Sequence, residues 1–156
     1  MKIAIVDDQK KDREELTETL IPYLHTLDFE TELCEYESAE AFLADFEKDE
    51  FDICFMDIYL KGMDGMTAAR FIARKDPNCF IIFLTTSPDY MAEGYDVRAW
   101  RYIVKPLHKD AVRKILEPCI EQVVLSRRYL HVKSDRQELD IPYSTTVSYT
   151  HLRAHE

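Results

Sequence analysis

Five short apolar runs alternate with longer segments of helical periodicity as far as about residue 125. Each run is too short for a helix and long enough for a buried strand. Because strict alternation of strands and helices favours parallel pairing, the sequence predicts an α/β fold with helices on both faces. Five such units predict a flavodoxin-like (βα)5 doubly wound sheet of order 2-1-3-4-5. The predicted strands are residues 2–6, 31–36, 53–57, 80–84 and 100–104.

The predicted elements differ in how far they are buried. Residues 80–84 are uniformly apolar, as in a strand covered on both faces, whereas residues 31–36 alternate and predict an edge strand. In the helix after the first strand, residues 12–15 are expected to be solvated. Pro22 and Pro118 each predict a bend in a helix. A helix beginning at Asp64-Gly65 is expected to use Met66, Ala69, Phe71, Ile72 and Ala73, and a short helix is expected from Pro88 through Tyr95.

Charge and cysteine content narrow the classes of function. The net charge is −10, and the first 60 residues hold 18 acidic against 5 basic side chains, which disfavours nucleic-acid binding through phosphates by this half. The four cysteines show no metal-ligand spacing and are expected to be buried thiols. No apolar run is long enough to cross a bilayer and no secretory leader is visible, so we expect a cytoplasmic protein.

Three acids stand at the carboxyl ends of strands that should be neighbours. Asp7 and Asp8 follow the first strand, and Asp57 ends the third. Crowded carboxylates repel one another unless a cation neutralises them, and Mg²⁺ prefers oxygen ligands. Thr85 and Lys105 end the fourth and fifth strands at the same edge. Acids, a hydroxyl and an ammonium are suited to placing a phosphoryl group on a carboxylate.

Residues 1–125 resemble the receiver domain of a two-component response regulator. The resemblance implies that Asp57 accepts a phosphoryl group from a phosphohistidine on a sensor histidine kinase, with Mg²⁺ as cofactor, and that the chain is not a turnover enzyme. The matching motifs are Ile5-Val6-Asp7-Asp8, Met56-Asp57-Ile58, Gly62-Met63-Asp64-Gly65, Thr85-Thr86 and Lys105-Pro106.

The same resemblance assigns roles around Asp57. Asp8 would bind Mg²⁺ directly and Asp7 largely through water, with Asp57 and the backbone carbonyl of Tyr59 as further ligands. Thr85 would hydrogen-bond the acyl phosphate, and Lys105 would pair with it. The Lys105–Pro106 peptide is expected to be cis, and Tyr102 matches an aromatic switch that moves inward when Thr85 shifts.

Residues 83–99 resemble the LytTR (LytR/AgrA-type) subgroup, and residues 129–146 resemble the start of its DNA-binding domain. The expected hairpin strands there are residues 129–133 and 137–141. The predicted division is therefore 1–125 for the receiver, 126–146 for a linker and truncated DNA-binding domain, and 147–156 for a non-native tail without strand or helix period. DNA binding would need the full-length effector domain.

The resemblance also predicts a homodimer through the fourth-helix and fifth-strand face, which carries Tyr90, Tyr95, Arg98 and Arg101. Phosphorylation would then control dimerisation and transcription.

Three alternatives remain at this point. A haloacid-dehalogenase-like Mg²⁺-dependent phosphohydrolase would need an acid two residues after its nucleophile, but Lys10 stands there relative to Asp8. A flavodoxin-type ligand binder would need a first loop that cradles phosphate, which Asp7-Asp8-Gln9 would repel. A stand-alone receiver in a phosphorelay would use the same site without a DNA-binding domain.

Overall fold

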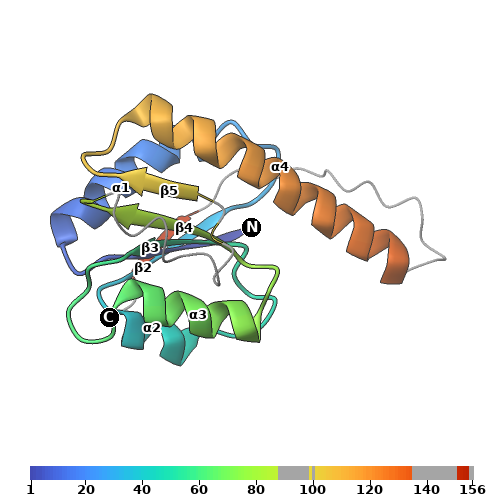
Figure 1. Cartoon of the computed structure of the whole chain (residues 1–156). Coiled ribbons are helices and arrows are strands. Elements are labelled where there is room, and N and C mark those ends of the chain that lie inside the picture. Colours follow the sequence, from blue (N-terminus) through green and yellow to red (C-terminus); the bar gives the residue numbers. More distant parts are fainter. Residues whose placement is uncertain (88–98, 100, 135–150, 155–156) are drawn as a thin grey trace.

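The computed structural model describes residues 1–87, 99, 101–134 and 151–154. Their elements follow the predicted alternation (Figure 1). In chain order they are β1 (Lys2–Val6), α1 (Lys10–Leu24), β2 (Glu32–Tyr36), α2 (Ala39–Asp45), β3 (Ile53–Asp57), α3 (Gly65–Lys75), β4 (Phe80–Thr85), β5 (Arg101–Val104), α4 (Lys109–Ser134) and β6 (His151–Ala154).

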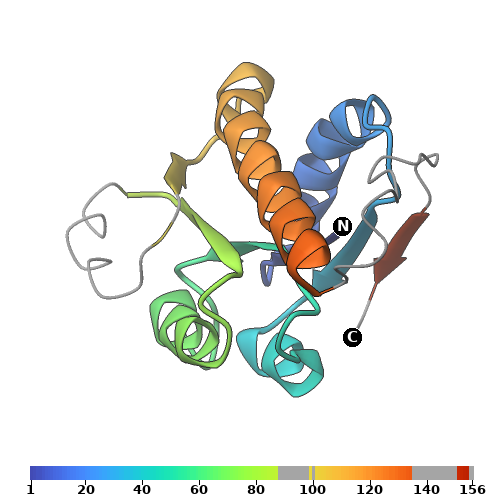
Figure 2. The same cartoon turned by 90° about the vertical axis from the view of Figure 1, so that its right-hand side faces the viewer.

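All strand pairs in the sheet are parallel, and the strand order is β5-β4-β3-β1-β2-β6. The predicted flavodoxin-like order 2-1-3-4-5 is therefore confirmed. Helices α1 and α4 cover one face of the sheet, and α2 and α3 cover the other (Figure 2). Each face has its own apolar cluster, one packed under α1 and α4 and one under α2 and α3. The core thus fixes strands β1 to β5, and their carboxyl ends meet at one edge.

Local sequence sets where α2 and α3 begin and end. The side chains of Ser38 and Asp64 cap these helices by accepting hydrogen bonds from the backbone N–H groups of Ala41 (3.0 Å) and Thr67 (2.8 Å). Helix α3 ends before Asp76, as predicted from Pro77, because the residue before a proline avoids the helical region. Its predicted buried face is correct for Met66, Ala69 and Ile72, but Phe71 is 55% exposed.

The predicted hairpin after the receiver is wrong in its first strand. Residues 129–133 lie in α4, which continues to Ser134 and projects past the sheet (Figure 1). Alternation over five residues is a weak strand signal, whereas an established helix adds one hydrogen bond for each residue and meets no Gly or Pro between Cys119 and Ser134. The second predicted strand, residues 137–141, lies outside the described residues. So does the helix expected from Pro88 to Tyr95.

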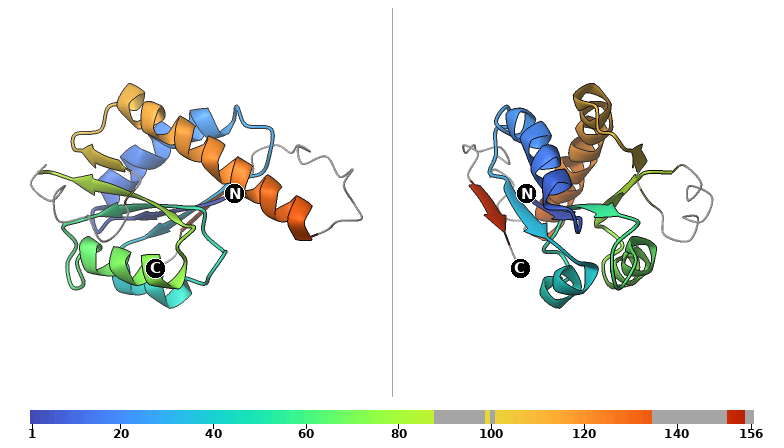
Figure 3. Two further views of the ribbon diagram at one scale, coloured as in Figure 1. Left: turned by 45° about the vertical axis from the view of Figure 1, so that its right-hand side comes forward. Right: turned by 90° about the vertical axis from the view of Figure 1, so that its left-hand side faces the viewer.

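Strand β2 is not at the edge of the sheet, contrary to prediction. Residues 151–154, expected to lack strand character, form β6 and pair parallel with β2 in the register Glu32↔His151 (Figure 3). The side-chain pattern did not predict the pairing of β6 with β2, because the hydrogen bonds between two strands are made by backbone N–H and C=O groups. Among the described helices, none combines the length and apolar character needed to cross a membrane.

Candidate functional site

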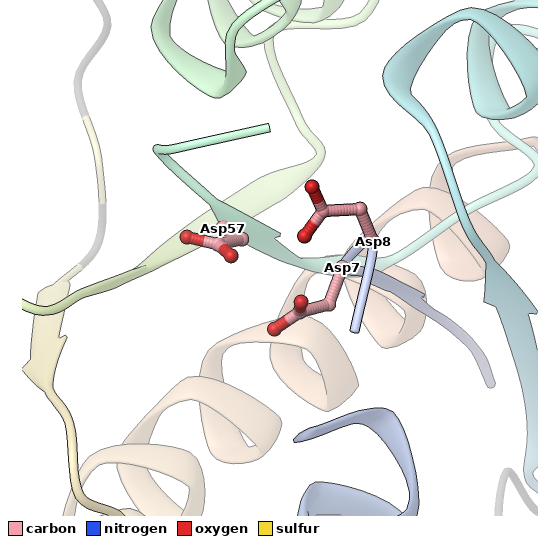
Figure 4. Close-up of side chains that lie close together, drawn as sticks. All are labelled: Asp7, Asp8 and Asp57. Carbon is pink, nitrogen blue, oxygen red and sulfur yellow. The ribbon is translucent and has the colours of Figure 1, made fainter. Parts of the chain in front are cut away.

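The carboxylates of Asp7, Asp8 and Asp57 meet where β1 and β3 end (Figure 4). These strands pair in the register Val6↔Met56, which places the residues that follow side by side. One oxygen from each acid lies within 4.8 Å of the others. Asp7 and Asp57 are buried, and Asp8 is half-buried. The structure therefore brings together the three acids predicted from strand ends.

Lys105 places its ammonium group against this cluster. Its Nζ atom donates to Asp7 Oδ2 at 3.0 Å and to Asp57 Oδ2 at 3.3 Å. A third hydrogen bond, at 2.8 Å, goes to Asp12 Oδ2. Asp12 was predicted to be solvated, and that prediction is wrong. Asp12 lies one turn before the buried Leu16, and its helical position does not indicate that the loop after β5 passes beside it.

Burial and charge shift the pKa values of the central pair. Burial, followed by the negative charge of Asp7, raises the pKa of Asp57 to about 6, although Lys105 and the Tyr59 N–H oppose the rise. For Lys105, burial alone would lower the pKa, but hydrogen bonds to Asp12 and Asp7 and the charge of Asp57 raise it above its ordinary value. At neutral pH the site therefore holds a charged Lys105 beside an ionised Asp57 carboxylate.

The loop after β3 orients the Asp57 carboxylate through the backbone. The Tyr59 N–H donates to Asp57 Oδ1 at 3.1 Å, and the Lys61 N–H donates to Asp8 Oδ2 at 3.3 Å. The Gly65 N–H donates to Ile58 O at 2.9 Å and brings the start of α3 against the strand end. Beside this loop lies a pocket of about 540 Å³, lined by Asp8, Ile58, Tyr59, Leu60, Lys61, Asp64, Met66 and Arg70.

Thr85 and Tyr102 lie on the strands next to this site. Thr85 is fully buried, and its hydroxyl donates to Ser87 O at 2.8 Å and accepts from the Ser87 N–H at 3.1 Å. The Tyr102 ring stacks on Phe83 with centroids 5.3 Å apart. The Lys105 N–H donates to Thr85 O at 2.7 Å, and the Lys105–Pro106 peptide is cis. A backbone hydrogen bond thus links Thr85 to Lys105, whose ammonium group contacts the acidic cluster.

Arg13 is a second residue of α1 that was wrongly expected to be solvated. It donates to the backbone carbonyl of Asp7 at 2.8 Å and pairs with Glu35 at 3.4 Å, with only 13% of its side chain exposed. Arg13 therefore ties α1 to β1 and β2 beside the acidic cluster. Only the packing of α1 over the strand ends makes this contact possible.

The donor set fits a hard divalent cation. Asp7, Asp12 and Asp57 contact Lys105, and Asp8 lies beside Asp7 and Asp57, so four carboxylates share one lysine and leave an excess of three negative charges when all are ionised. Buried charges of one sign need a counter-ion, and carboxylate oxygens are ligands suited to Mg²⁺. Asp7, Asp8 and Asp57 are the residues that would hold such an ion.

A doubly wound parallel sheet with an acidic pocket and a paired lysine at its carboxyl edge defines a receiver-type domain. The chain belongs to the response regulator receiver domain family, whose model matches residues 3–117. It is therefore a receiver of two-component signalling and not a turnover enzyme, which sets aside the phosphohydrolase alternative.

Similar proteins agree with this assignment. The sensory transduction protein LytR of Staphylococcus epidermidis is 32% identical over 73% of this chain and 44% of its own length. The transcriptional regulatory protein RprY of Bacteroides fragilis is 30% identical over 72% of this chain and 48% of its own. The chain spans about half the length of the curated relatives it matches.

Among solved structures, the response regulator TrrA of Thermotoga maritima, in complex with Mg²⁺ and BeF, has a TM-score of 0.65 and 26% identity. That match covers 76% of this chain and 97% of TrrA.

Proposed function

We propose that this protein is a phosphorylation-controlled response regulator in which Asp57 accepts a phosphoryl group from a sensor histidine kinase. The observation that carries the proposal is the buried Asp57 carboxylate, flanked by Asp7 and hydrogen-bonded to Lys105 at 3.3 Å. Asp57 stays ionised at neutral pH because its pKa is raised only to about 6. An ionised carboxylate is the form that attacks phosphorus.

The proposed transfer makes one bond and breaks one bond. A carboxylate oxygen of Asp57 attacks the phosphorus of a phosphohistidine, and the P–N bond breaks with its electron pair returning to the imidazole nitrogen. The product is an acyl phosphate on Asp57. The Tyr59 N–H donates to Asp57 Oδ1, and the Lys105 ammonium donates to Asp57 Oδ2. These two hydrogen bonds restrict the orientation of the attacking carboxylate.

Mg²⁺ is the cofactor of this proposal, with Asp8, Asp7, Asp57 and the Tyr59 carbonyl as its protein ligands. When bound, the ion would offset the charge of the carboxylates and of the transferring phosphoryl oxygens. Lys105 would pair with the phosphoryl group, and Thr85 would hydrogen-bond it after its hydroxyl leaves the Ser87 backbone. The Mg²⁺-bound TrrA structure supports this cofactor.

Phosphorylation from a small donor tests the proposal. The protein is incubated with Mg²⁺ and acetyl phosphate, and its intact mass is measured. We expect the mass of one phosphoryl group to be added to wild type and not to Asp57→Asn. Asp49→Asn, the same change at an exposed position, is the matched control and is expected to behave as wild type.

Two results would contradict the proposed function. One is an Asp57→Asn variant that gains the same mass as wild type. The other is phosphorylation that continues unchanged after a chelator has removed divalent cations.

The output that we propose is LytTR-type transcription control, with DNA contacted only by a full-length effector domain. The similarity to LytR supports this output, and α4 supports a continuous helical connection from the receiver as far as Ser134. Residues 126–146 would be the linker and the start of that domain, and 147–156 a non-native tail. The switch would run from Thr85 through Tyr102, which already packs on Phe83.

Dimerisation through the face formed by the predicted fourth helix, residues 88–95, and the fifth strand is part of the same proposal. Arg101 is exposed on β5, while Tyr90, Tyr95 and Arg98 lie outside the described residues. Light scattering with and without beryllofluoride and Mg²⁺ tests this point. A dimer is expected with the phosphoryl mimic, and a monomer under both conditions would contradict it.

A further inference from the structure

The Lys105 ammonium group is shared between the acceptor pocket and helix α1. We propose that Asp12 is a positioning residue that draws Lys105 toward α1 and thereby lowers the affinity of the site for a phosphoryl group. This inference rests on the proposed phosphorylation of Asp57. It adds a residue that neither the receiver motifs nor the cluster of three carboxylates includes.

The distances favour Asp12 over Asp57 as a partner of Lys105. An ammonium group has three N–H donors, and the three carboxylates around Lys105 use all of them. The Asp12 contact, at 2.8 Å, falls in the range of strong charge-assisted hydrogen bonds, whereas the Asp57 contact at 3.3 Å is longer. A phosphoryl group on Asp57 would therefore meet an ammonium group whose donors are already occupied.

Asp12 differs from the other two partners in its freedom to move. Asp7 and Asp57 are buried at strand ends, with 1% and 7% of their side chains exposed, but 31% of the Asp12 side chain is exposed. It lines a groove of about 360 Å³ together with Asp7, Glu15, Leu84, Thr86, Lys105, Pro106 and Leu107. Asp12 can be hydrated when Lys105 leaves, so its hydrogen bond is the one that the ammonium group can exchange.

Both effects of Asp12 act in the same direction on an anion. Its carboxylate competes for Lys105, and its negative charge repels a phosphoryl group entering the site. The effect on a cation is the opposite, because the same charge attracts Mg²⁺. Removing the charge of Asp12 should therefore strengthen phosphoryl binding and slightly weaken Mg²⁺ binding.

Calorimetric titrations of wild type and Asp12→Asn test the inference with two probes, Mg²⁺ alone and beryllofluoride at saturating Mg²⁺. We expect Asp12→Asn to bind beryllofluoride about 3- to 10-fold more tightly, as the loss of one competing charge-assisted hydrogen bond implies. Its Mg²⁺ affinity should fall or stay unchanged. Asp12→Glu keeps the charge and should restore the wild-type affinities.

Glu15→Gln is the matched control, since Glu15 lies on the same helix and lines the same groove. It should change beryllofluoride affinity by no more than about twofold, as expected for an exposed charge in salt. A purely structural role of Asp12 predicts that Asp12→Asn weakens binding of both probes, and that result would overturn the inference. An equal gain in Glu15→Gln would overturn it as well.

The outcomes separate this inference from the proposed function. If wild type binds beryllofluoride and gains a phosphoryl group at Asp57 while Asp12→Asn shows no gain in affinity, only the role of Asp12 is wrong. If wild type gains no phosphoryl group, the proposed function is wrong and the inference falls with it.

Discussion

Gly65 and Asp57 are in direct backbone contact: a Cβ atom on Gly65 would lie 2.0 Å from the carbonyl oxygen of Asp57. The Gly65 N–H also donates to the neighbouring Ile58 carbonyl at 2.9 Å. Helix α3 can therefore begin against the end of β3 only because residue 65 has no side chain. The glycine fixes the loop in which the Tyr59 N–H donates to the Asp57 carboxylate.

Gly65→Ala should destabilise the fold, because the clash is with backbone atoms that cannot turn away. We expect the free energy of unfolding to fall by about 2–3 kcal/mol, as for an overpacked site. Gly62→Ala is the comparison: Gly62 has a φ of +78°, but the atom its Cβ would meet is the flexible end of Glu40. Its expected cost is about 1 kcal/mol. Urea unfolding measures both, and equal losses would contradict the expectation.

Asp57→Asn should stabilise the metal-free protein at neutral pH. Because the pKa of Asp57 is raised from 3.8 to about 6, the folded protein binds a proton that the unfolded chain has already released in that window. The unfolding free energy of wild type therefore falls as pH rises through the window, and the loss is complete above it. Asparagine carries no charge, so the free-energy cost of keeping Asp57 ionised in the folded protein is removed. The loss of the Lys105 contact offsets part of this gain in stability. We expect a net gain of about 1–2 kcal/mol at about pH 7.5.

Urea unfolding across pH in the presence of a chelator checks this prediction. The difference between Asp57→Asn and wild type should shrink toward about pH 4, where the Asp57 carboxyl is protonated in the folded state and about half protonated in the unfolded state. A variant less stable than wild type at neutral pH would show that the Lys105 contact outweighs the desolvation of the carboxylate.

Lys105→Met should destabilise the metal-free protein by leaving Asp7 and Asp57 without their cationic partner. We expect a loss of about 2–4 kcal/mol, as when one partner of a buried ion pair is removed. Added Mg²⁺ should restore more stability to this variant than to wild type, since the ion replaces the missing charge. Lys109→Met, at an exposed lysine, is the control and should change stability by about 0.5 kcal/mol or less. A loss that Mg²⁺ leaves untouched would argue against electrostatic compensation.

Ile72→Ala and Phe71→Ala should differ sharply in cost although the two residues are adjacent on α3. Ile72 is fully buried, whereas Phe71 is 55% exposed. We expect Ile72→Ala to lower the unfolding free energy by about 2–4 kcal/mol through the cavity it leaves. Phe71→Ala should cost about 1 kcal/mol or less. Thermal or urea unfolding measures both losses of unfolding free energy. Similar losses for the two variants would contradict the orientation of α3, in which Ile72 is buried and Phe71 is exposed.

Much of the acidic site could be predicted from the chain because it depends on strand ends. An apolar run determines where a strand stops, and parallel strands end at one edge of their sheet. Asp7, Asp8, Asp57 and Lys105 meet for that reason. Periodicity could not tell which helical residues would reach the same edge. Asp12 and Arg13 lie one turn before the buried Leu16, yet their polar groups contact Lys105, Asp7 and Glu35.

The sequence by itself determined the alternation of strands and helices, the strand order and the acids at the carboxyl edge, since burial periodicity and strand termination are local properties. Only the tertiary structure decided that α4 continues to Ser134, that β6 adds to β2, and that Asp12 shares the Lys105 ammonium. Alternating polarity over five residues is only a weak strand signal, and the helix already formed outweighs it. A charged side chain in the first turn of a helix, such as that of Asp12, finds a long-range partner only when another element packs beside it.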